Sequence, residues 1–348
     1  MNDIFLKACR KEKVPYTPVW IMRQAGRYMK EYRDIREKYS FITLCKTPDL
    51  AAEVTLTPVK KLGVDAAILF SDILILAEAM GIEIAFNEKD GPLLKNPVRD
   101  KSSADSLSIP DPEDKVPFVM ETIRILRNKL EGGIPLIGFS GAPFTLASYM
   151  VEGGTSRNFT IIKRMMYQNP SLYHTLLDKI TKSISLYVSS QIKAGAQAIQ
   201  LFDTWAGILA PEDYRDFALP YTKAIIENIK GTSTPIILYI NGCGGLLEFM
   251  KEAGPDVISL DWRIGLDRAT QRLGKDIAVQ GNLDPCALFL PPEKIESRVR
   301  DILEKAKDSP GHIFNLGHGI LPETPVENAI LMVEAVHKFS KRPKTQDT

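Results

Sequence analysis

The chain contains 348 residues but only four cysteines, which are scattered and form no CxxC pair. They make neither a disulfide framework nor a zinc motif, and they suit a reducing compartment. An excess of one charge is missing as well. The formal net charge is +1, so nothing global attracts nucleic acid or an anionic membrane. No apolar run is long enough to span a membrane, and residues 1–13 carry no apolar signal core. We therefore expect a cytoplasmic protein.

Several motifs of nucleotide and metal chemistry are also absent. There is no Walker sequence, no HExxH, and no glycine-rich dinucleotide fingerprint after the first apolar run. No lysine follows any of the predicted strands, which argues against a Schiff-base aldolase. No second histidine or cysteine stands at ligand spacing from His318, so we expect no metal there.

Eight short apolar runs recur along the chain, and stretches with helical periodicity separate them. Continuous apolar runs of this length are typical of parallel strands buried on both faces. Eight is the number that a (β/α)8 TIM barrel requires. The runs are residues 19–22, 66–70, 136–139, 198–202, 236–240, 257–260, 277–280 and 312–316. The sequence therefore predicts an α/β barrel. A doubly wound sheet is the alternative, and the missing dinucleotide fingerprint counts against it.

One connection between the predicted strands is unusually long. After the second strand, residues 82–86 and a turn at Asp90 and Gly91 predict either an added hairpin or an irregular excursion, which ends near Pro112. We interpret it as an insertion between strands 2 and 3 of a single domain, residues 1–340. Residues 341–348 are polar, and we expect them to form a disordered tail.

Polar or glycine residues follow all eight runs, which is where barrel enzymes carry their catalytic groups. These strand-end residues are Arg23, Asp72, Gly141, Asp203 with Thr204, Asn241 with Gly242, Asp261, Gly281 with Asn282, and Gly317 with His318 and Gly319. Their agreement with the barrel pattern is stronger than any single motif in the chain.

Four arginines and a single lysine, Lys30, follow the first run closely. The arginines are Arg23, Arg27, Arg33 and Arg36. A guanidinium matches the fork of a carboxylate or phosphate, whereas an ammonium does not. Arg33 and Arg36 are equally compatible with a solvated helix face, but Arg23 and Arg27 come directly after a buried run. The cluster predicts an anionic ligand.

The other candidate residues each have a structural alternative. Asp72 either caps a helix or, where a cation keeps it ionised, stabilises positive charge in a transition state. Asp203 and Thr204 either cap a turn or bind a ligand. Tyr149 by itself suggests a core aromatic. His318 is either a plain loop histidine or, because glycines flank it, a residue that approaches a ligand closely.

Taken together, these motifs resemble the uroporphyrinogen decarboxylase family over nearly the whole chain. Residues 18–27 (PVWIMRQAGR) are similar to the first family signature, and residues 138–150 (GFSGAPFTLASYM) to the second. Residues 70–74 (FSDIL), 280–285 (QGNLDP) and 315–320 (NLGHGI) also match in order. The departures are Thr204, where many relatives carry serine, and Lys30, where proline is common.

The resemblance implies a (β/α)8 barrel that forms a homodimer and a decarboxylase that uses no metal or organic cofactor. Its substrate would be uroporphyrinogen III, a cyclic tetrapyrrole with eight carboxylates. The four acetate arms become methyls, giving coproporphyrinogen III in porphyrin and haem biosynthesis. The implied catalytic residues are Asp72, Arg23 and Arg27. The implied substrate-binding residues are Arg23, Gln24, Ala25, Gly26, Arg27, Arg36, Asp72, Phe139, Tyr149, Phe202, Thr204 and His318.

The resemblance also implies a role for each group. Arg23 and Arg27 would hold substrate carboxylates, Phe139 and Phe202 would pack on the macrocycle, and Asp72 would accept hydrogen bonds from the pyrrole N–H groups. Protonation of a pyrrole carbon makes the ring a cationic electron sink, which an ionised carboxylate stabilises at short range. Arginine is a poor acid, so the proton donor stays open between an arginine and an arginine-held water.

Two rival functions fit a chain of this kind. Cobalamin-linked methyltransferases of the same barrel superfamily bind zinc through a His-x-Cys pair after the fifth strand. This chain has Asn241, Gly242 and Cys243 there, so the histidine is missing and zinc activation of a thiol is disfavoured. The second rival is a non-catalytic tetrapyrrole carrier. It is disfavoured only indirectly, because every expected functional position is occupied.

Overall fold

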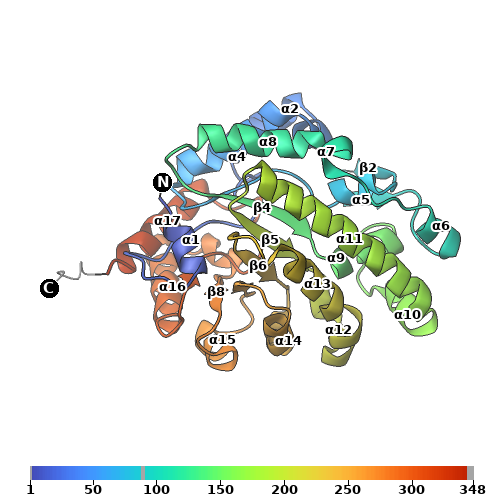
Figure 1. Ribbon diagram of the computed structural model, residues 1–348. Coiled ribbons are helices and arrows are strands. Elements are labelled where there is room, and N and C mark those ends of the chain that lie inside the picture. The colour runs from blue at the N-terminus through green and yellow to red at the C-terminus, as the bar shows by residue number, and fades with distance from the viewer. Residues whose placement is uncertain (1, 88–90, 343–348) are drawn as a thin grey trace.

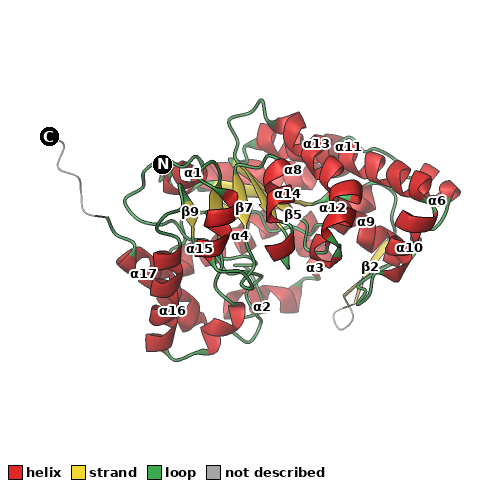
Figure 2. Ribbon diagram, turned by 90° about the horizontal axis from the view of Figure 1, so that it is seen from below, coloured by secondary structure: helices red, strands yellow, loops and turns green. Residues whose placement is uncertain are grey.

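The computed structural model describes residues 2–87 and 91–342 of the chain. Its main sheet has seven strands, each paired in parallel with its neighbours. In sheet order they are β1 (Ala67–Ile68), β4 (Leu136–Gly141), β5 (Ala198–Phe202), β6 (Ile236–Tyr239), β7 (Val257–Ser259), β8 (Ala278–Gln280) and β9 (His312–Ile313). Figures 1 and 2 show these strands at the centre of the molecule with helices around them. The protein is therefore an α/β protein with a curled parallel sheet.

The helices fill the connections between the strands, and many of them begin with proline. Proline suits the first helical position because its φ is preset and its missing N–H has no helical acceptor there. The helices are α1 (Ile4–Cys9), α2 (Lys30–Lys38), α3 (Phe41–Lys46), α4 (Pro48–Leu62), α5 (Ile75–Ala79), α6 (Lys101–Asp105), α7 (Pro112–Lys115), α8 (Pro117–Lys129), α9 (Pro143–Glu152), α10 (Thr160–Gln168), α11 (Pro170–Ala194), α12 (Pro211–Phe217), α13 (Leu219–Ile229), α14 (Leu247–Glu252), α15 (Leu266–Leu273), α16 (Pro292–Lys305) and α17 (Val326–Phe339). Short 3-10 helices are η1 (Ala206–Ile208), η2 (Cys243–Gly245) and η3 (Pro285–Phe289).

The first predicted strand is only a single parallel bridge, between Val19 and Phe314. The Phe314 N–H donates to the Pro18 carbonyl at 2.8 Å, and on the other side the Asp65 N–H donates to the Val19 carbonyl, also at 2.8 Å. The bridge therefore lies between β9 and β1, the two edge strands. It does not extend into a ladder because the chain turns at Arg23, whose φ is +64°.

The long connection after β1 contains a separate hairpin. Strands β2 (Ile84–Asn87) and β3 (Gly91–Leu94) pair antiparallel, as the predicted hairpin requires. Asp90, in the predicted turn, lies outside the described residues, and so do residues 343–348 of the predicted tail.

Two apolar clusters lie on the two faces of the main sheet. The larger one packs the sheet against the surrounding helices. The smaller one takes residues from the inner face of every strand and from α1; its members include Phe5, Trp20, Met22, Ala66, Ile137, Ala198, Ile237, Tyr239, Val257, Ala278 and Ile313. Inside it, the Trp20 Nε1–H donates to Gln280 Oε1 at 2.8 Å, so the segment before Arg23 and β8 meet within the curl. The Gln280 Nε2 in turn donates to Ser259 Oγ at 2.9 Å, so this buried amide is hydrogen-bonded through both of its polar atoms.

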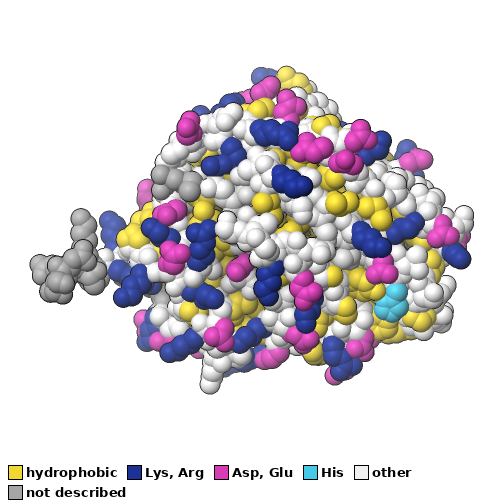
Figure 3. Space-filling view, viewed as in Figure 1, with side chains coloured by type: hydrophobic (Ala, Val, Ile, Leu, Met, Phe, Trp, Pro, Cys, Tyr) yellow, Lys and Arg dark blue, Asp and Glu magenta, His cyan; other side chains and the backbone are white. Residues whose placement is uncertain are grey.

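The surface of the protein carries both signs of charge. Figure 3 shows lysine and arginine side chains interspersed with aspartate and glutamate over the face that it presents. Among the described residues, no helix is both long and apolar enough to cross a membrane.

Candidate active site

A tight turn at the end of the first bridge presents Arg23. The Gln24 N–H donates to the Ile21 carbonyl at 2.8 Å, and Arg23 adopts a left-handed backbone that costs a non-glycine residue about 1–2 kcal/mol. The Gln24 side chain holds this turn. Its Oε1 accepts the Ile21 N–H at 3.2 Å, and its Nε2 donates to the Ala66 carbonyl at 3.3 Å. Gln24 as a whole residue is 1 % exposed, so in this structure it supports the turn from within.

The exposed Arg23 side chain lies against Gly319, from the opposite end of the sequence. A Cβ on Gly319 would lie 2.4 Å from Arg23 Cδ and 2.9 Å from Cγ, so only glycine leaves room for the arginine here. The Arg23 charge acts on two other candidates, because it lowers the pKa of both Asp72 and His318. The three side chains therefore belong to one electrostatic site.

Asp72 is half-buried, and only one of its two carboxylate oxygens is hydrogen-bonded within the described residues. Its Oδ1 accepts the Leu74 N–H at 2.8 Å, which orders the entry to α5. Burial raises the pKa of Asp72, while the Leu74 N–H and the Arg23 charge act in the opposite direction. Within the described residues the second carboxylate oxygen has no hydrogen-bond partner in the protein. The capping interpretation and the binding interpretation of Asp72 are thus compatible.

Rings from four strand ends form a row beside these charges. Phe139 meets Phe202 edge to face at 5.7 Å between centroids, and Phe202 meets Tyr239 at 6.1 Å. Tyr239 in turn meets His318 at 6.2 Å. Phe202 and Tyr239 are register partners on β5 and β6, and Phe139 stands two residues before Gly141, the register partner of Phe202 on β4. The row offers an apolar wall next to Arg23.

His318 is a neutral imidazole in this site. Burial and the charges of Arg23 and Arg263 lower its pKa to about 4, and the Asp261 charge acts against them. Its Nδ1 accepts the Gly319 N–H at 2.7 Å, which leaves the proton of the neutral ring on Nε2. His318 is therefore a hydrogen-bond donor through Nε2 at neutral pH.

Tyr149 and Trp205 form a further pair of rings near Asp72. Tyr149, on α9, meets Trp205 edge to face at 6.0 Å. Burial raises the pKa of Tyr149, and the Asp72 charge adds to this, whereas the Arg23 charge opposes it. These effects place Tyr149 with Asp72 and Arg23 rather than in the remote core that its sequence context alone suggested.

The remaining candidates are less closely joined to this site. Arg27 is exposed, and Arg36 donates from Nη1 to the Tyr39 carbonyl at 2.5 Å. Both charges act on Tyr32, whose pKa they lower against the effect of burial. Ala25 and Gly26 are half-buried in the turn between Arg23 and Arg27. Thr204 is half-buried, and no ring contact or hydrogen bond of its side chain is found in the described part of the chain.

Asp203 takes the structural role that its sequence left open. The side chain is fully buried, and its Oδ1 accepts the Thr145 N–H at 3.1 Å and the Thr145 hydroxyl at 2.8 Å. The Thr145 oxygen then accepts the Trp205 N–H at 3.1 Å. Asp203 Oδ2 is buried without a partner among the residues that the structure describes, and burial raises the pKa of this carboxyl to about 7. Asp203 thus holds the loop that carries Thr204 and Trp205.

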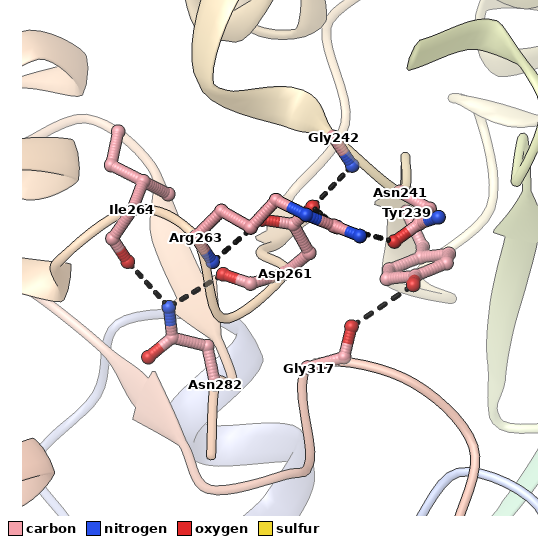
Figure 4. Close-up of polar contacts among 8 residues, drawn as sticks. All are labelled: Tyr239, Asn241, Gly242, Asp261, Arg263, Ile264, Asn282 and Gly317. Carbon is pink, nitrogen blue, oxygen red and sulfur yellow. Dashed lines mark hydrogen bonds and ion pairs between the residues drawn. The ribbon is translucent and has the colours of Figure 1, made fainter. Parts of the chain in front are cut away.

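Sequence reasoning missed two residues that the structure brings to the site, Tyr239 and Arg263. Tyr239 lay inside a predicted strand, and Arg263 stands two residues after the strand-end Asp261. Figure 4 shows Arg263 bonded to Asp261 and Asn241 and, as a separate contact, the Tyr239 hydroxyl donating to the Gly317 carbonyl at 3.0 Å. The available signal was position: both residues stand within three residues of a predicted strand end.

A cavity in the described part of the chain lies elsewhere. It measures about 690 Å³ and is lined by residues that precede the first bridge and β9, including Val14, Thr17 and Gly311. The candidate residues follow the strands instead, so the two features lie at opposite ends of the sheet. Side-chain chemistry, not cavity size, identifies the site.

The charged and aromatic candidates meet at the carboxyl edge of a curled parallel sheet, which is where α/β enzymes carry their active sites. The family model described as uroporphyrinogen decarboxylase (URO-D) matches residues 1–339. A curated relative from Carboxydothermus hydrogenoformans, named uroporphyrinogen decarboxylase, is 58% identical over 340 residues, covering 98% of this chain and 97% of its own. One of the same name from Geobacter metallireducens is 54% identical over 342 residues, covering 98% and 100%. The chain belongs to the uroporphyrinogen decarboxylase family.

Solved structures support the fold alone. A methyltransferase from Methanosarcina mazei superimposes with a TM-score of 0.84 at 24% identity, covering 97% of this chain and 98% of its own. A B12-independent methionine synthase from Shewanella sp. W3-18-1 gives a TM-score of 0.57 at 12% identity, covering 84% and 87%.

Proposed function

We propose that this chain removes the four acetate carboxyl groups of uroporphyrinogen III, giving coproporphyrinogen III, without a metal or organic cofactor. The activity is that of its family, whose curated members match the chain from end to end at more than half identity. The observation that carries the mechanism is the free oxygen of Asp72 beside Arg23 and the row of rings.

Substrate binding divides between charged and apolar groups. Arg23, Arg27 and Arg36 hold carboxylates of the substrate, since a guanidinium pairs with a carboxylate through two parallel hydrogen bonds. Phe139 and Phe202 pack on the macrocycle. The backbone of Gln24, Ala25 and Gly26 lines the site, and Tyr149, Thr204 and His318 supply further polar contacts.

The chemistry needs an electron sink on the substrate itself. A proton added to a ring carbon makes the pyrrole cationic. Carbon dioxide then leaves the acetate arm, and the electron pair of the broken C–C bond neutralises the ring. A second proton converts the exocyclic methylene to a methyl, and loss of the first proton restores the pyrrole. Asp72 stabilises the cation through its free oxygen.

The proton donor is either Arg23 or a water molecule that Arg23 holds. Arginine has a pKa above about 12, so it gives up a proton readily only where its surroundings disfavour its charge. His318 is neutral and donates through Nε2, which suits it to orient a carboxylate or a water molecule rather than to act as a cationic acid.

The wider architecture follows the same proposal. Residues 1–340 form one (β/α)8 barrel in which the bridge at Val19 takes the first strand position and the β2–β3 hairpin is an insertion. The hydrogen bonds of Val19 and Phe314 toward both edge strands support this. The protein acts as a homodimer in the cytoplasm. Analytical ultracentrifugation tests the dimer: a monomer mass at micromolar concentration would refute it.

The methyltransferase alternative is not favoured. Its zinc site needs a histidine two residues before the cysteine, and this chain has Asn241 at that position before Cys243. The methyltransferase structure is only 24% identical in sequence to this chain, so the likeness supports a shared fold and not a shared function.

One experiment tests the activity directly. The protein is incubated with reduced uroporphyrinogen without oxygen, the products are oxidised, and the fluorescent porphyrins are separated by chromatography. We expect products with seven, six, five and finally four carboxylates. Binding of the substrate without loss of carboxylate would favour the carrier instead. A protein that neither binds nor converts the substrate would refute the proposal.

A further inference from the structure

Arg263 is held rigidly at the same edge of the sheet as Arg23. Its Nη1 donates to Asn241 Oδ1 at 2.9 Å and to Asp261 Oδ2 at 2.7 Å. Its guanidinium also stacks over the Trp262 ring at 4.1 Å from the centroid. Figure 4 shows the side chain extended between Asp261 and Asn241. Three independent contacts thus fix the position of one side chain.

The loop beneath Arg263 is fixed as well. Asp261 is fully buried; its Oδ1 accepts the Arg263 N–H at 3.0 Å, and its Oδ2 also accepts the Gly242 N–H. The Asn282 side chain donates to the carbonyls of Asp261 and Ile264, both at 2.7 Å. An arginine on such a support loses little conformational freedom when a ligand binds, which favours affinity.

Most of the guanidinium remains available. Only Nη1 is engaged, and in the described part of the chain no hydrogen bond joins Nε or Nη2 to the protein. The side chain is 53% exposed. The Nε–H and one Nη2–H lie on the same edge of the planar group, which matches the two oxygens of a carboxylate.

Arg263 lies at the edge of the sheet that carries the proposed active site, since its partners Asn241 and Asp261 follow the carboxyl ends of β6 and β7. Its charge and that of Arg23 both lower the pKa of His318, and both act on Tyr239. The two arginines therefore approach the same pair of residues from different parts of the chain.

We propose that Arg263 is a further substrate-binding residue, which holds one carboxylate of the tetrapyrrole through its Nε and Nη2 edge. This assignment rests on the proposed function, since the ligand is its polycarboxylate substrate. Arg263 lies beyond the signature that carries Arg23 and Arg27 and defines a second point of attachment across the row of rings.

The alternative role for Arg263 is only that of a counterion for buried Asp261. Four variants separate the two roles: Arg263→Gln, Arg263→Lys, the double variant Asp261→Asn with Arg263→Gln, and the control Arg268→Gln. Arg268 is exposed on α15 and forms no ion pair within the described residues. Each is assayed for KM and kcat with uroporphyrinogen and for Tm.

We expect Arg263→Gln to raise KM about tenfold or more, as loss of a charged hydrogen-bonded pair does. Arg263→Lys should recover part of this loss, because an ammonium attracts a carboxylate but cannot pair side-on. The control should keep the wild-type KM. The double variant is decisive: it removes the buried carboxylate together with its counterion, so a KM that stays raised cannot come from an uncompensated charge on Asp261.

A double variant with the KM of the wild-type protein would overturn the assignment and leave Arg263 as a counterion. So would Arg263→Gln with an unchanged KM. In both cases the wild-type protein still removes carboxyl groups from uroporphyrinogen as carbon dioxide, so the proposed function stands. A wild-type protein that does not decarboxylate uroporphyrinogen would instead refute the proposed function, and this assignment with it.

Discussion

The contact between Arg23 and Gly319 offers a way to move the arginine without removing it. In Gly319→Ala, the new methyl group would lie 2.4 Å from Arg23 Cδ and 3.0 Å from Nε. The φ of Gly319 is not in the left-handed region, so alanine fits the backbone without strain. The substitution therefore acts on the arginine side chain and not on the fold.

The size of the effect follows from the distance. Carbon atoms attract best at about 3.5 Å, so Arg23 Cδ has to retreat by about 1 Å. A misplacement of about 1 Å in a catalytic constellation costs about 100-fold in rate, equivalent to about 2.7 kcal/mol of transition-state stabilisation. Because the arginine is exposed and free to move into solvent, we expect the free energy of unfolding to change by less than about 1 kcal/mol.

The assay compares kcat/KM for uroporphyrinogen with Tm in the wild-type protein, Gly319→Ala and the control Gly231→Ala. Gly231 is exposed, and a Cβ there meets no atom within 4 Å. We expect only Gly319→Ala to lose activity. If it keeps the wild-type kcat/KM, the position of Arg23 against Gly319 is not needed for catalysis. If its Tm also falls by many degrees, the methyl group disturbs the fold and the reasoning from side-chain displacement is wrong.

Three further predictions concern buried or half-buried ionisable groups. Asp72→Asn keeps the oxygen that accepts the Leu74 N–H but loses the negative charge. In an anaerobic assay with uroporphyrinogen, kcat should therefore fall by about 100-fold or more, while KM stays within a few-fold of the wild-type value. An unchanged kcat would refute the cation-stabilising role. Burial lowers the pKa of His312 to about 4, so the unfolded chain binds more protons between pH 6.5 and 4 and stability falls as the pH drops through that window. His312→Gln should flatten this fall in urea unfolding by up to about 3 kcal/mol at pH 4, and an equal pH slope would contradict the assignment. Burial raises the pKa of Asp203 to about 7, so its contribution to stability declines as the pH rises from about 4 to 7. Asp203→Asn should therefore raise Tm relative to the wild-type protein more at pH 8 than at pH 5, and a lower Tm at pH 8 would show that the negative charge itself stabilises the loop.

Much of the architecture could be predicted from local sequence. Apolar runs of four or five residues predicted β4, β5 and β6 at nearly their observed positions, because parallel strands buried on both faces need uninterrupted apolar side chains. The hairpin of β2 and β3 could be predicted from its turn residues. Both signals depend on neighbours in sequence, which is why one chain suffices to find them.

The first strand position shows where this reasoning fails. Residues 19–22 have the composition of a strand, yet the pairing stops after Val19. The Met22 N–H donates to the side chain of Asn315 at 2.9 Å instead of continuing the ladder, and Arg23 turns the backbone. The hydrogen-bond partner that ends the strand lies almost three hundred residues away, so no local pattern reports it.

The sequence by itself determined which residue types stand at the strand ends. It therefore predicted a site for an anionic ligand, and its motifs predicted the family. Only the tertiary structure decided which side chains meet. It placed Arg23 against Gly319, and it used the Gln24 side chain to hold the turn at Arg23. It also used the Asp203 side chain to hold the loop after β5, and it anchored Arg263 on Asp261 and Asn241. The physical reason is that these contacts depend on the register of parallel strands and on burial. Both arise only when segments far apart in the chain pack together.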